Sequence, residues 1–326
     1  FAAHAENEIR ELADLMQIPV ITTMMGISVF PDDDQLFCGM IGTHGVKMAN
    51  AAVNECDVLF LVGARVGDRA VKTPLALEKT TKIIHIDIDP AEIGKNIGAD
   101  LPLVGDAKLV LQQMTELAKP MKHDEWMAHI KTLGGERKYV EPAKGTVNPR
   151  VFIDRLAKKM PANVTVVADV GQNQIWTCTE YKFRKEGRLL TSGGMGTMGY
   201  SVPAAIGAKM ADNSRATVAI CGDGAFQMSF MELATAVQFG VDIKVVVMTN
   251  NRLGMVRELQ TNGYHDRQTA VFLDGSPDFI KLAEAYGIPA MRVYDDDTME
   301  KGVEMLAEHK GICLVEVVVD KDMPTL

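Results

Sequence analysis

The side chains best suited to chemistry lie in two short polar sequences, each directly after a strand-like apolar run. Asp223 stands between Gly222 and Gly224, and Asn250 follows the next such run along the chain. Carboxylate and amide oxygens are hard ligands that Mg2+ prefers, and this ion usually fills its roughly six positions with water and phosphate oxygens as well. Glycines let a bulky anion approach the backbone, because they carry no side chain. These residues therefore predict a site for Mg2+ and a diphosphate group, completed by a backbone carbonyl after Asn250.

Each of these sequences taken alone is more typical of a tight turn, since glycine, aspartate and asparagine dominate turns. Their pairing favours a site, because both follow predicted strands that one helix and one strand separate. The carboxyl ends of parallel strands form the ligand-binding edge of an open α/β sheet. The intervening helix, expected to begin near Ala225, would point its N-terminal amides at the phosphates. We expect that helix to pack on the sheet through Phe226, Phe230, Leu233 and Val237.

A second glycine pattern competes with this interpretation. Gly194, Gly196 and Gly199 fit the GxGxxG pattern between a predicted strand and a predicted helix, which is typical of a dinucleotide-binding turn. A single match is weakly specific, and the acidic partner at the end of the next strand could only be Asp223, which the metal site already uses. The preferred account is that the glycines let this loop pass a bound cofactor, with Met198 as an apolar edge. A non-catalytic module that binds NAD is the alternative function.

The predicted site requires strands whose carboxyl ends lie side by side. The apolar patterning predicts such strands. Apolar runs alternate with helical spacing along the whole chain, which predicts an α/β fold of two three-layer domains with parallel sheets. In the first part we expect helices at 5–17, 46–54 and 107–118 and strands at 18–23, 58–62 and 82–88. In the second part we expect helices at 149–159, 202–210, 226–239, 277–286 and 298–309, and strands at 164–169, 188–192, 216–221, 243–249 and 312–319.

The pattern decays in the middle of the chain, where charged and small residues dominate. We interpret residues 121–148 as a linker, partly helical around Trp126. The sequence thus predicts a first domain at 1–120 and a second domain at 149–326.

The composition narrows the class of protein. A chain of 326 residues with 47% hydrophobic and 24% charged residues is typical of a soluble globular protein of two domains. The net charge of -9 argues against nucleic acid or an anionic membrane as partner. Apolar runs stop far short of the roughly 20 residues of a membrane span. Five scattered cysteines without a Cys-x-x-Cys pair indicate thiols in a reducing compartment, so we expect a cytoplasmic protein.

Several longer sequences share one resemblance that covers the whole chain. In the second part they are residues 169–176, 191–207, 222–224 and 250–256, and in the first part 22–26, 42–45, 63–69, 84–87 and 105–106. These sequences resemble the catalytic subunit of acetolactate (acetohydroxyacid) synthase, a thiamine-diphosphate-dependent enzyme family. Another thiamine-dependent 2-oxoacid decarboxylase or carboligase is the closest alternative.

The resemblance implies the condensation of two 2-oxoacids in branched-chain amino-acid biosynthesis. On thiamine diphosphate, pyruvate would lose carbon dioxide, and the remaining two-carbon unit would add to a second pyruvate or to 2-oxobutyrate. A homo-oligomer, dimer or tetramer, is implied, and a regulatory small subunit is left open. Mg2+ would be held by Asp223, Asn250 and the carbonyl of Arg252. The implied contacts to thiamine diphosphate are Gly171, Gln172, Gly196, Met198, Gly222, Gly224, Ala225, Gly254 and Met255.

The first domain resembles the FAD-binding middle domain of the same family. The implied FAD contacts are Thr23, His44, Gly63, Ala64, Arg65, Arg69, Asp87, Ile88, Gly105 and Asp106. Related decarboxylases keep this fold without flavin, so a purely structural role for these residues is the alternative. Three positions depart from the family: Gly67 replaces an aspartate, Asn173 a histidine and Leu259 a tryptophan.

The family's catalytic glutamate comes from an N-terminal domain of the partner subunit, and no residue of this sequence matches it. We therefore expect a fragment that lacks this domain, contains no catalytic residue of its own and is inactive alone. Glu232 and Glu258 are the nearest carboxylates by sequence. We expect Glu232 to face solvent and Glu258 to lie on a helix over the site.

Overall fold

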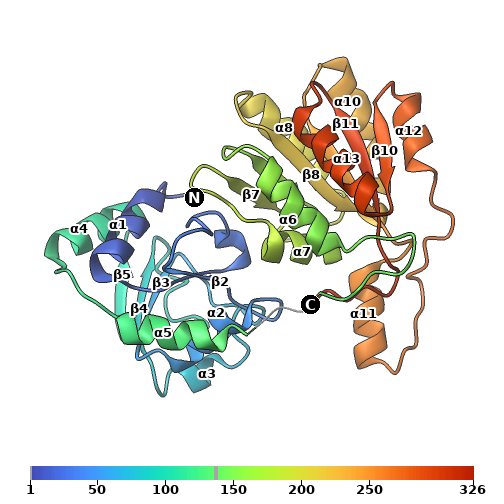
Figure 1. The fold of residues 1–326 in the computed structure, drawn as a ribbon. Helices are drawn as coiled ribbons and strands as arrows, with labels where there is room; N and C mark the ends of the chain where they lie inside the picture. The colour runs from blue at the N-terminus through green and yellow to red at the C-terminus, as the bar shows by residue number, and fades with distance from the viewer. Residues whose placement is uncertain (1, 136–138) are drawn as a thin grey trace. The chain divides into compact units, whose positions relative to one another are not determined.

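The computed structural model describes residues 2–135 and 139–326 of the chain. The chain forms two compact units, Phe1–Arg137 and Lys138–Leu326, here named unit 1 and unit 2. Each is built from parallel strands and helices that alternate along the chain (Figure 1). The predicted α/β class is therefore confirmed. Among the described residues, no helix combines the length and apolar character needed to cross a membrane.

The described residues of unit 2 contain a six-stranded sheet in which all neighbouring strands are parallel, in the order β10-β11-β9-β8-β6-β7. Every residue of β9 is buried. Helices cover both faces of such a strand, which is why its sequence is an almost continuous apolar run. The strands are β6 (Thr165–Ala168), β7 (Arg188–Thr191), β8 (Thr217–Gly222), β9 (Lys244–Thr249), β10 (Ala290–Val293) and β11 (Cys313–Val318).

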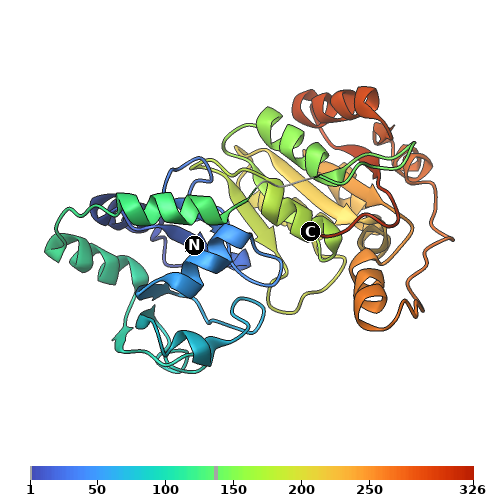
Figure 2. The ribbon, with the colours of Figure 1, turned by 60° about the horizontal axis from the view of Figure 1, so that its bottom comes forward.

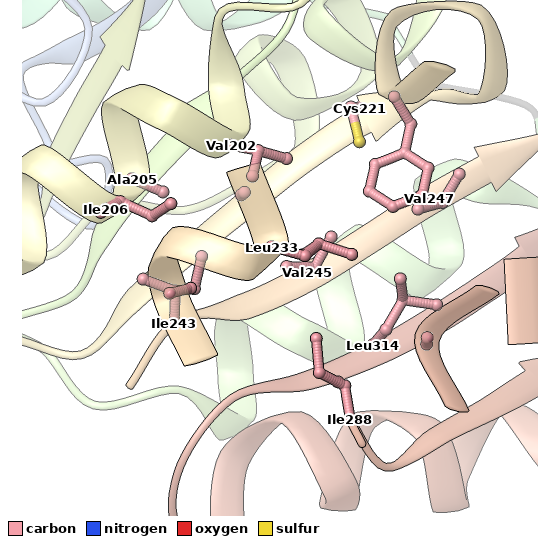
Figure 3. Close-up of a cluster of buried hydrophobic side chains, with 14 of the residues drawn as sticks. Val202, Ala205, Ile206, Cys221, Leu233, Ile243, Val245, Val247, Ile288 and Leu314 are labelled. Atoms are coloured by element: carbon pink, nitrogen blue, oxygen red, sulfur yellow. The ribbon is translucent and has the colours of Figure 1, made fainter. Parts of the chain in front are cut away.

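Helices form a layer on each face of this sheet (Figure 1, Figure 2). One layer contains α6 (Pro149–Lys159), α7 (Gln172–Glu180) and α13 (Asp296–Glu308), and the other α8 (Ser201–Ala211), α10 (Leu233–Gln238) and α12 (Phe279–Ala285). Figure 3 shows the second layer, where Val202 of α8 and Leu233 of α10 pack in one buried cluster with Val245 and Val247 of β9. This core fixes the strands whose carboxyl ends carry the candidate site.

The single helix expected at 226–239 is wrong, because the helix is interrupted after Gln227. Ser229, with a φ of −144°, leaves the helical conformation, and the chain then turns through a short 3-10 segment. Phe226 and Leu233 are fully buried as expected, but Val237 is 43% exposed, because the break rotates later residues off the original helical spacing. The three pieces are α9 (Asp223–Gln227), η2 (Phe230–Glu232) and α10.

The apolar pattern also fails to predict α7. All nine residues of this helix are buried, although most of them are polar. A helix covered on every side has no amphipathic stripe, so its sequence lacks the period on which the prediction depends. Its polar side chains form buried hydrogen bonds instead, such as Thr177 Oγ1 to the carbonyl of Asn173 at 2.7 Å.

Within residues 2–135, unit 1 has a three-stranded parallel sheet, β3-β4-β5, and a separate parallel pair, β1-β2. The strands are β1 (Val20–Thr22), β2 (Phe37–Met40), β3 (Val58–Val62), β4 (Lys82–Asp87) and β5 (Leu101–Val104). The helices are α1 (Glu6–Met16), η1 (Met24–Gly26), α2 (Lys47–Glu55), α3 (Pro74–Leu77), α4 (Ala107–Leu117) and α5 (Asp124–Leu133). The apolar pattern does not predict β2, which is only four residues long and contains a glycine, or β5, which is equally short and mostly exposed.

The interval expected to be a linker contains the whole of α5. Ile130 of this helix is fully buried in a cluster with Cys38 and Ala52. His129 Nε2 also lies 2.7 Å from Glu55 Oε2 at the end of α2. Helix α5 is therefore an integral part of unit 1, and the boundary between the compact units follows it.

Candidate functional site

Asp223 is the first residue of α9, directly after β8, and is only 2% exposed. Its Oδ1 accepts the backbone N–H of Gly224 at 2.8 Å. Its Oδ2 accepts the backbone N–H groups of Asn250 at 3.1 Å and Asn251 at 2.6 Å. One carboxylate therefore joins the ends of β8 and β9. Burial raises the pKa of this carboxyl to about 6, although the three backbone donors oppose the rise.

The place of this carboxylate in the sheet is one where open α/β sheets bind ligands. From β6 the chain continues to β7 on one side, and β8 then pairs with β6 on the other side. The strand order therefore reverses between β6 and β8. A crevice outside the carboxyl ends of strands forms at such a reversal. Gly171 after β6 and Gly222 at the end of β8 both lie at this point.

The oxygens of Asn250 and Arg252 lie on one side of the loop after β9. The backbone N–H of Arg252 donates to Asn250 Oδ1 at 3.1 Å. Arg252 also pairs with Phe272 in an isolated antiparallel bridge whose hydrogen bonds are made by the flanking residues. In a pair of this kind the N–H and C=O groups of both residues point away from the partner. The Arg252 carbonyl thus points to the Asn250 side, and among the described residues no backbone N–H donates to it.

These three residues fit a Mg2+ ion. They offer a carboxylate, an amide oxygen and a carbonyl without a backbone donor, which are the hard oxygen ligands this ion takes. A cation beside Asp223 would offset the burial that raises the pKa of its carboxyl. No group of three or more His, Cys, Asp or Glu side chains able to hold a metal occurs in residues 2–135 or 139–326. A metal at this site therefore depends on amide and main-chain oxygens together with one carboxylate.

Several of the predicted cofactor-contact residues lie close together around two glycines. A Cβ on Gly254, the first residue of α11 (Gly254–Gly263), would lie 1.9 Å from Gln172 Oε1 and 3.1 Å from Asn250 Nδ2. A Cβ on Gly224 would lie 3.2 Å from the Met198 Cε atom. The loops after β6, β7, β8 and β9 therefore meet at one place, where a Cβ on either glycine would require neighbouring side chains to move.

The remaining residues predicted to contact the cofactor differ in which of their atoms could reach it. Gly171 and Gly196 have φ angles of 141° and 65°, which favour glycine, and the space around Gly196 is open. Ala225 is 2% exposed and packs in the core, so only its main chain could reach a ligand. Met255 follows Gly254 on α11 and is half-buried.

Gln172 is held by the last residues of the chain. Its Nε2 donates to the Met323 carbonyl at 2.9 Å, to Thr325 Oγ1 at 3.2 Å and to Glu258 Oε2 at 3.1 Å. Glu258, on α11, in turn accepts the backbone N–H of Thr325 at 3.2 Å. The expected helix over the site is present, and its carboxylate is tied to Gln172 and the C-terminal segment. Glu232 is partly buried and accepts a hydrogen bond from Thr235 Oγ1 at 3.1 Å, so it faces solvent only in part.

Asp169 is a functional candidate that the sequence analysis did not single out. It is fully buried at the end of β6, and its oxygens accept the backbone N–H groups of Val170, Gly199 and Ser201 at 2.8–3.0 Å. Burial raises the pKa of this carboxyl, and these donors oppose the rise. Asp169 thus anchors the glycine loop after β7 to the end of β6. The available signal was a single aspartate at the end of a predicted strand.

The same contacts argue against the dinucleotide interpretation. A pyrophosphate in a GxGxxG turn binds the free N–H groups at the start of the following helix. Here the N–H groups of Gly199 and Ser201, at the start of α8, donate to the Asp169 carboxylate. A second anion at this position would meet a carboxylate in place of free donors.

Asn173, at the position where the family commonly has histidine, faces inward. It is 3% exposed, and its Nδ2 donates to the carbonyls of Asp169 at 2.8 Å and Ile220 at 3.3 Å. These carbonyls lie at the ends of β6 and β8. The side chain therefore links the two strands at the reversal point. Leu259 is 60% exposed on α11.

In unit 1, three predicted contacts lie at the ends of neighbouring strands. Gly63, Asp87 and Gly105 stand at the carboxyl ends of β3, β4 and β5, where Gly105 N–H donates to the Asp87 carbonyl at 2.9 Å. Nothing lies within 4 Å of a Cβ placed on Gly63. The side chain of Ile88 is 70% exposed beside them.

The other predicted flavin contacts in unit 1 lie on loops and helix starts. Arg65 and Arg69 are exposed in the loop after β3, where cations can meet a pyrophosphate. Asp106 caps α4 by accepting the N–H of Leu109 at 3.2 Å. Together with the strand ends, these residues offer cations for phosphate, a carboxylate for ribose and an apolar side chain, so they fit a flavin dinucleotide. Thr23 stands before η1, and Ala64 and His44 are half-buried in loops.

Comparison with known proteins assigns both units to one class. Residues 2–114 match the family described as thiamine pyrophosphate enzyme, central domain. Residues 169–317 match the family described as thiamine pyrophosphate enzyme, C-terminal TPP binding domain. The chain therefore belongs to the thiamine pyrophosphate enzymes.

Within this class the chain is homologous to acetolactate synthase large subunits, which confirms the resemblance seen in the sequence. It is 40% identical to the probable acetolactate synthase large subunit of Methanocaldococcus jannaschii, with 97% of this chain and 55% of that protein covered. It is 36% identical to the acetolactate synthase large subunit of Lactococcus lactis, with 96% and 54% covered. It is 39% identical to the acetolactate synthase of Arthrospira platensis, with 98% and 57% covered. The chain spans about half the length of the curated relatives it matches.

Proposed function

We propose that this chain supplies the thiamine-diphosphate and Mg2+ site of an enzyme that condenses pyruvate with a second 2-oxoacid. The observation that carries the proposal is the buried Asp223 carboxylate, which joins the ends of β8 and β9 beside the oxygens of Asn250 and Arg252. The homologues named acetolactate synthase support this reaction. We further propose a cytoplasmic enzyme of branched-chain amino-acid biosynthesis.

The residues of this chain would bind and orient the cofactor. Asp223, Asn250 and the Arg252 carbonyl would hold Mg2+, whose positive charge would offset the negative charge of the diphosphate. When bound, thiamine diphosphate supplies the electron sink that makes decarboxylation of a 2-oxoacid feasible. The chain's own contribution would be a preformed site: the glycines would admit the diphosphate to the backbone, and packing of the sheet would hold the loops after β6, β7, β8 and β9 in place. The proposed cofactor contacts are Gly171, Gln172, Gly196, Met198, Gly222, Gly224, Ala225, Gly254 and Met255.

We propose that the carboxylate which activates the aminopyrimidine ring comes from outside these 326 residues. The support is that Glu258 is already tied to Gln172 and Thr325, and Glu232 to Thr235. The homologues' name, large subunit, supports assembly with a smaller subunit, and we propose a homo-oligomer that can bind such a partner.

The reaction is tested by assaying acetolactate as acetoin, with pyruvate alone and with added 2-oxobutyrate. We expect turnover by the protein expressed from its full reading frame and none by the 326-residue chain alone, because the activating carboxylate would be missing. Full turnover by the 326-residue chain would contradict the proposal that the activating carboxylate lies outside this chain. Absence of product from both proteins, with thiamine diphosphate bound, would contradict the proposed reaction.

We also propose that unit 1 binds FAD at the carboxyl ends of β3, β4 and β5. Asp87→Ala is expected to weaken flavin binding roughly tenfold or more, because hydrogen bonds from ribose hydroxyls to a carboxylate contribute about 1.5–3 kcal/mol. Flavin fluorescence titration measures the effect. Asp124→Ala, at the start of α5 in the same unit, is the control and should bind flavin like the wild type. Equal affinities for all three proteins would favour a structural role for these strand ends.

A further inference from the structure

A short segment beyond α11 sets the direction of the main chain at Arg252. The N–H of Leu253 donates to the Val271 carbonyl at 2.9 Å, and the N–H of Leu273 donates to the Asn251 carbonyl at 3.0 Å. The Arg252 carbonyl and the Leu253 N–H belong to one planar trans peptide, so they point in opposite directions. Because that N–H points at Val271, the carbonyl points away from the segment, to the side on which the Arg252 N–H meets Asn250 Oδ1.

The side chain of Arg252 also contacts the same segment. Its guanidinium lies 4.6 Å from the centre of the Phe272 ring. Its Nη1 donates to Asp274 Oδ1 at 2.9 Å and to the Asn251 carbonyl at 2.7 Å. The Arg252 side chain is 16% exposed, so it is held against the protein and does not extend into solvent. Side chains directly opposite in a pair without direct hydrogen bonds lie close together, which is why these two can stack.

The segment is also anchored to the helix that begins with Asp223. Gln227, at the end of α9, donates through Nε2 to Ser276 Oγ at 3.1 Å and to the Asp223 carbonyl at 3.3 Å. The Ser276 hydroxyl donates to the Leu273 carbonyl at 2.7 Å. One stretch of chain, residues 271–276, therefore contacts both the loop after β9 and helix α9, the two elements that carry the proposed metal ligands.

We propose that residues 271–276 are a positioning strap for the metal site. The strap rests on the proposed function, because it assumes that the Arg252 carbonyl is a Mg2+ ligand. The side chains of Phe272 and Asp274 hold Arg252, and the bridge they stabilise keeps its carbonyl on the same side as Asn250 Oδ1. Loosening the strap should weaken Mg2+ binding although no ligand is changed. Phe272, Asp274 and Ser276 are positioning residues, not ligands.

The test is a calorimetric titration of the 326-residue chain with Mg2+ in the presence of a fixed excess of thiamine diphosphate. We expect Phe272→Ala and Asp274→Ala each to weaken Mg2+ binding about threefold and the double variant about tenfold, which is the lower end of the effects seen for residues that orient metal ligands. Asp274→Glu, which can keep the ion pair, should recover most of the affinity. The control is Asp296→Ala, which removes the Arg155–Asp296 ion pair of 3.1 Å between α6 and α13 and should leave Mg2+ affinity unchanged.

A second readout separates positioning from general damage. In the double variant, amide hydrogen exchange should become faster at Leu253 and Leu273, whose N–H groups form the bridge, while the β8 and β9 amides keep their protection. Mg2+ affinity equal to the wild type in the double variant, with Asp223→Asn still abolishing binding, would overturn the strap and leave the proposed site intact. If the wild type itself binds no Mg2+, the proposed site is wrong and the strap fails with it. Loss of protection throughout β8 and β9 would also count against the strap, since the segment would then support the fold as a whole.

Discussion

Asp223→Asn is expected to abolish Mg2+-dependent binding of thiamine diphosphate by this chain. The carboxylate is the single anionic side chain among the three proposed ligands, so its replacement removes the charge that attracts a divalent cation. The amide group would also place an NH2 against one of the N–H donors of Gly224, Asn250 and Asn251, which now converge on the two carboxylate oxygens. We expect an affinity loss of at least about 100-fold, equivalent to about 2.7 kcal/mol.

The measurement is a calorimetric titration with thiamine diphosphate in the presence and absence of Mg2+. Thermal unfolding gives an independent readout, because a ligand that binds only the folded state raises the unfolding temperature. The wild type should gain stability from the two ligands together, and Asp223→Asn should not. Unchanged titrations for the variant would exclude Asp223 as a metal ligand. Binding of NAD in place of thiamine diphosphate would support the nucleotide-binding alternative.

Asp169→Asn is the matched comparison for this experiment. Asp169 is also buried, also follows a strand and also accepts three backbone N–H groups, but it is not a proposed ligand. Its main effect should be on folding, with a loss of about 1–3 kcal/mol from a poorly satisfied buried group. The two variants thus separate a carboxylate that binds a ligand from one that anchors a loop.

The elements that the sequence predicts well are those whose limits are set by local signals. The strand at 58–62 and the helix at 149–159 have the same bounds in the structure. The first is a continuous apolar run, and the second begins with Asn148 and Pro149, where Asn148 Oδ1 accepts the N–H of Arg150 at 2.9 Å. Caps and runs of this kind are local, so a single sequence contains all the information they need.

The features that could not be predicted from the sequence depend on contacts between distant parts of the chain. Asp169 anchors residues thirty positions later, and no local pattern distinguishes it from any aspartate after a strand. The contacts of Arg252 with Phe272 and Asp274 arise only because a later segment returns beside the loop after β9. The candidate ligands themselves could be predicted, because glycine and a hard oxygen after neighbouring strands are local signals. The residues that hold those ligands in place could not.

Gly254→Ala is expected to damage both the stability and the cofactor site of unit 2. The added Cβ would lie 1.9 Å from Gln172 Oε1 and 2.7 Å from its Cδ, so the amide must move. Gln172 is 4% exposed and its Nε2 is held by Glu258, Met323 and Thr325, which leaves it little room. Overpacking of this kind costs about 1–3 kcal/mol of unfolding free energy. Displacement of Gln172 and Asn250 should also weaken thiamine diphosphate binding.

Gly263→Ala is the control, at the other end of the same helix. A Cβ there meets nothing within 4 Å, so the substitution adds no clash. Alanine restricts the unfolded chain, and we expect a gain of about 0.4–1 kcal/mol. Urea denaturation should therefore shift the two midpoints in opposite directions, down for Gly254→Ala and up for Gly263→Ala. A Gly254→Ala variant as stable as the wild type would mean that Gln172 does not pack against the start of α11, and the close meeting of the loops after β6 and β9 would then be wrong.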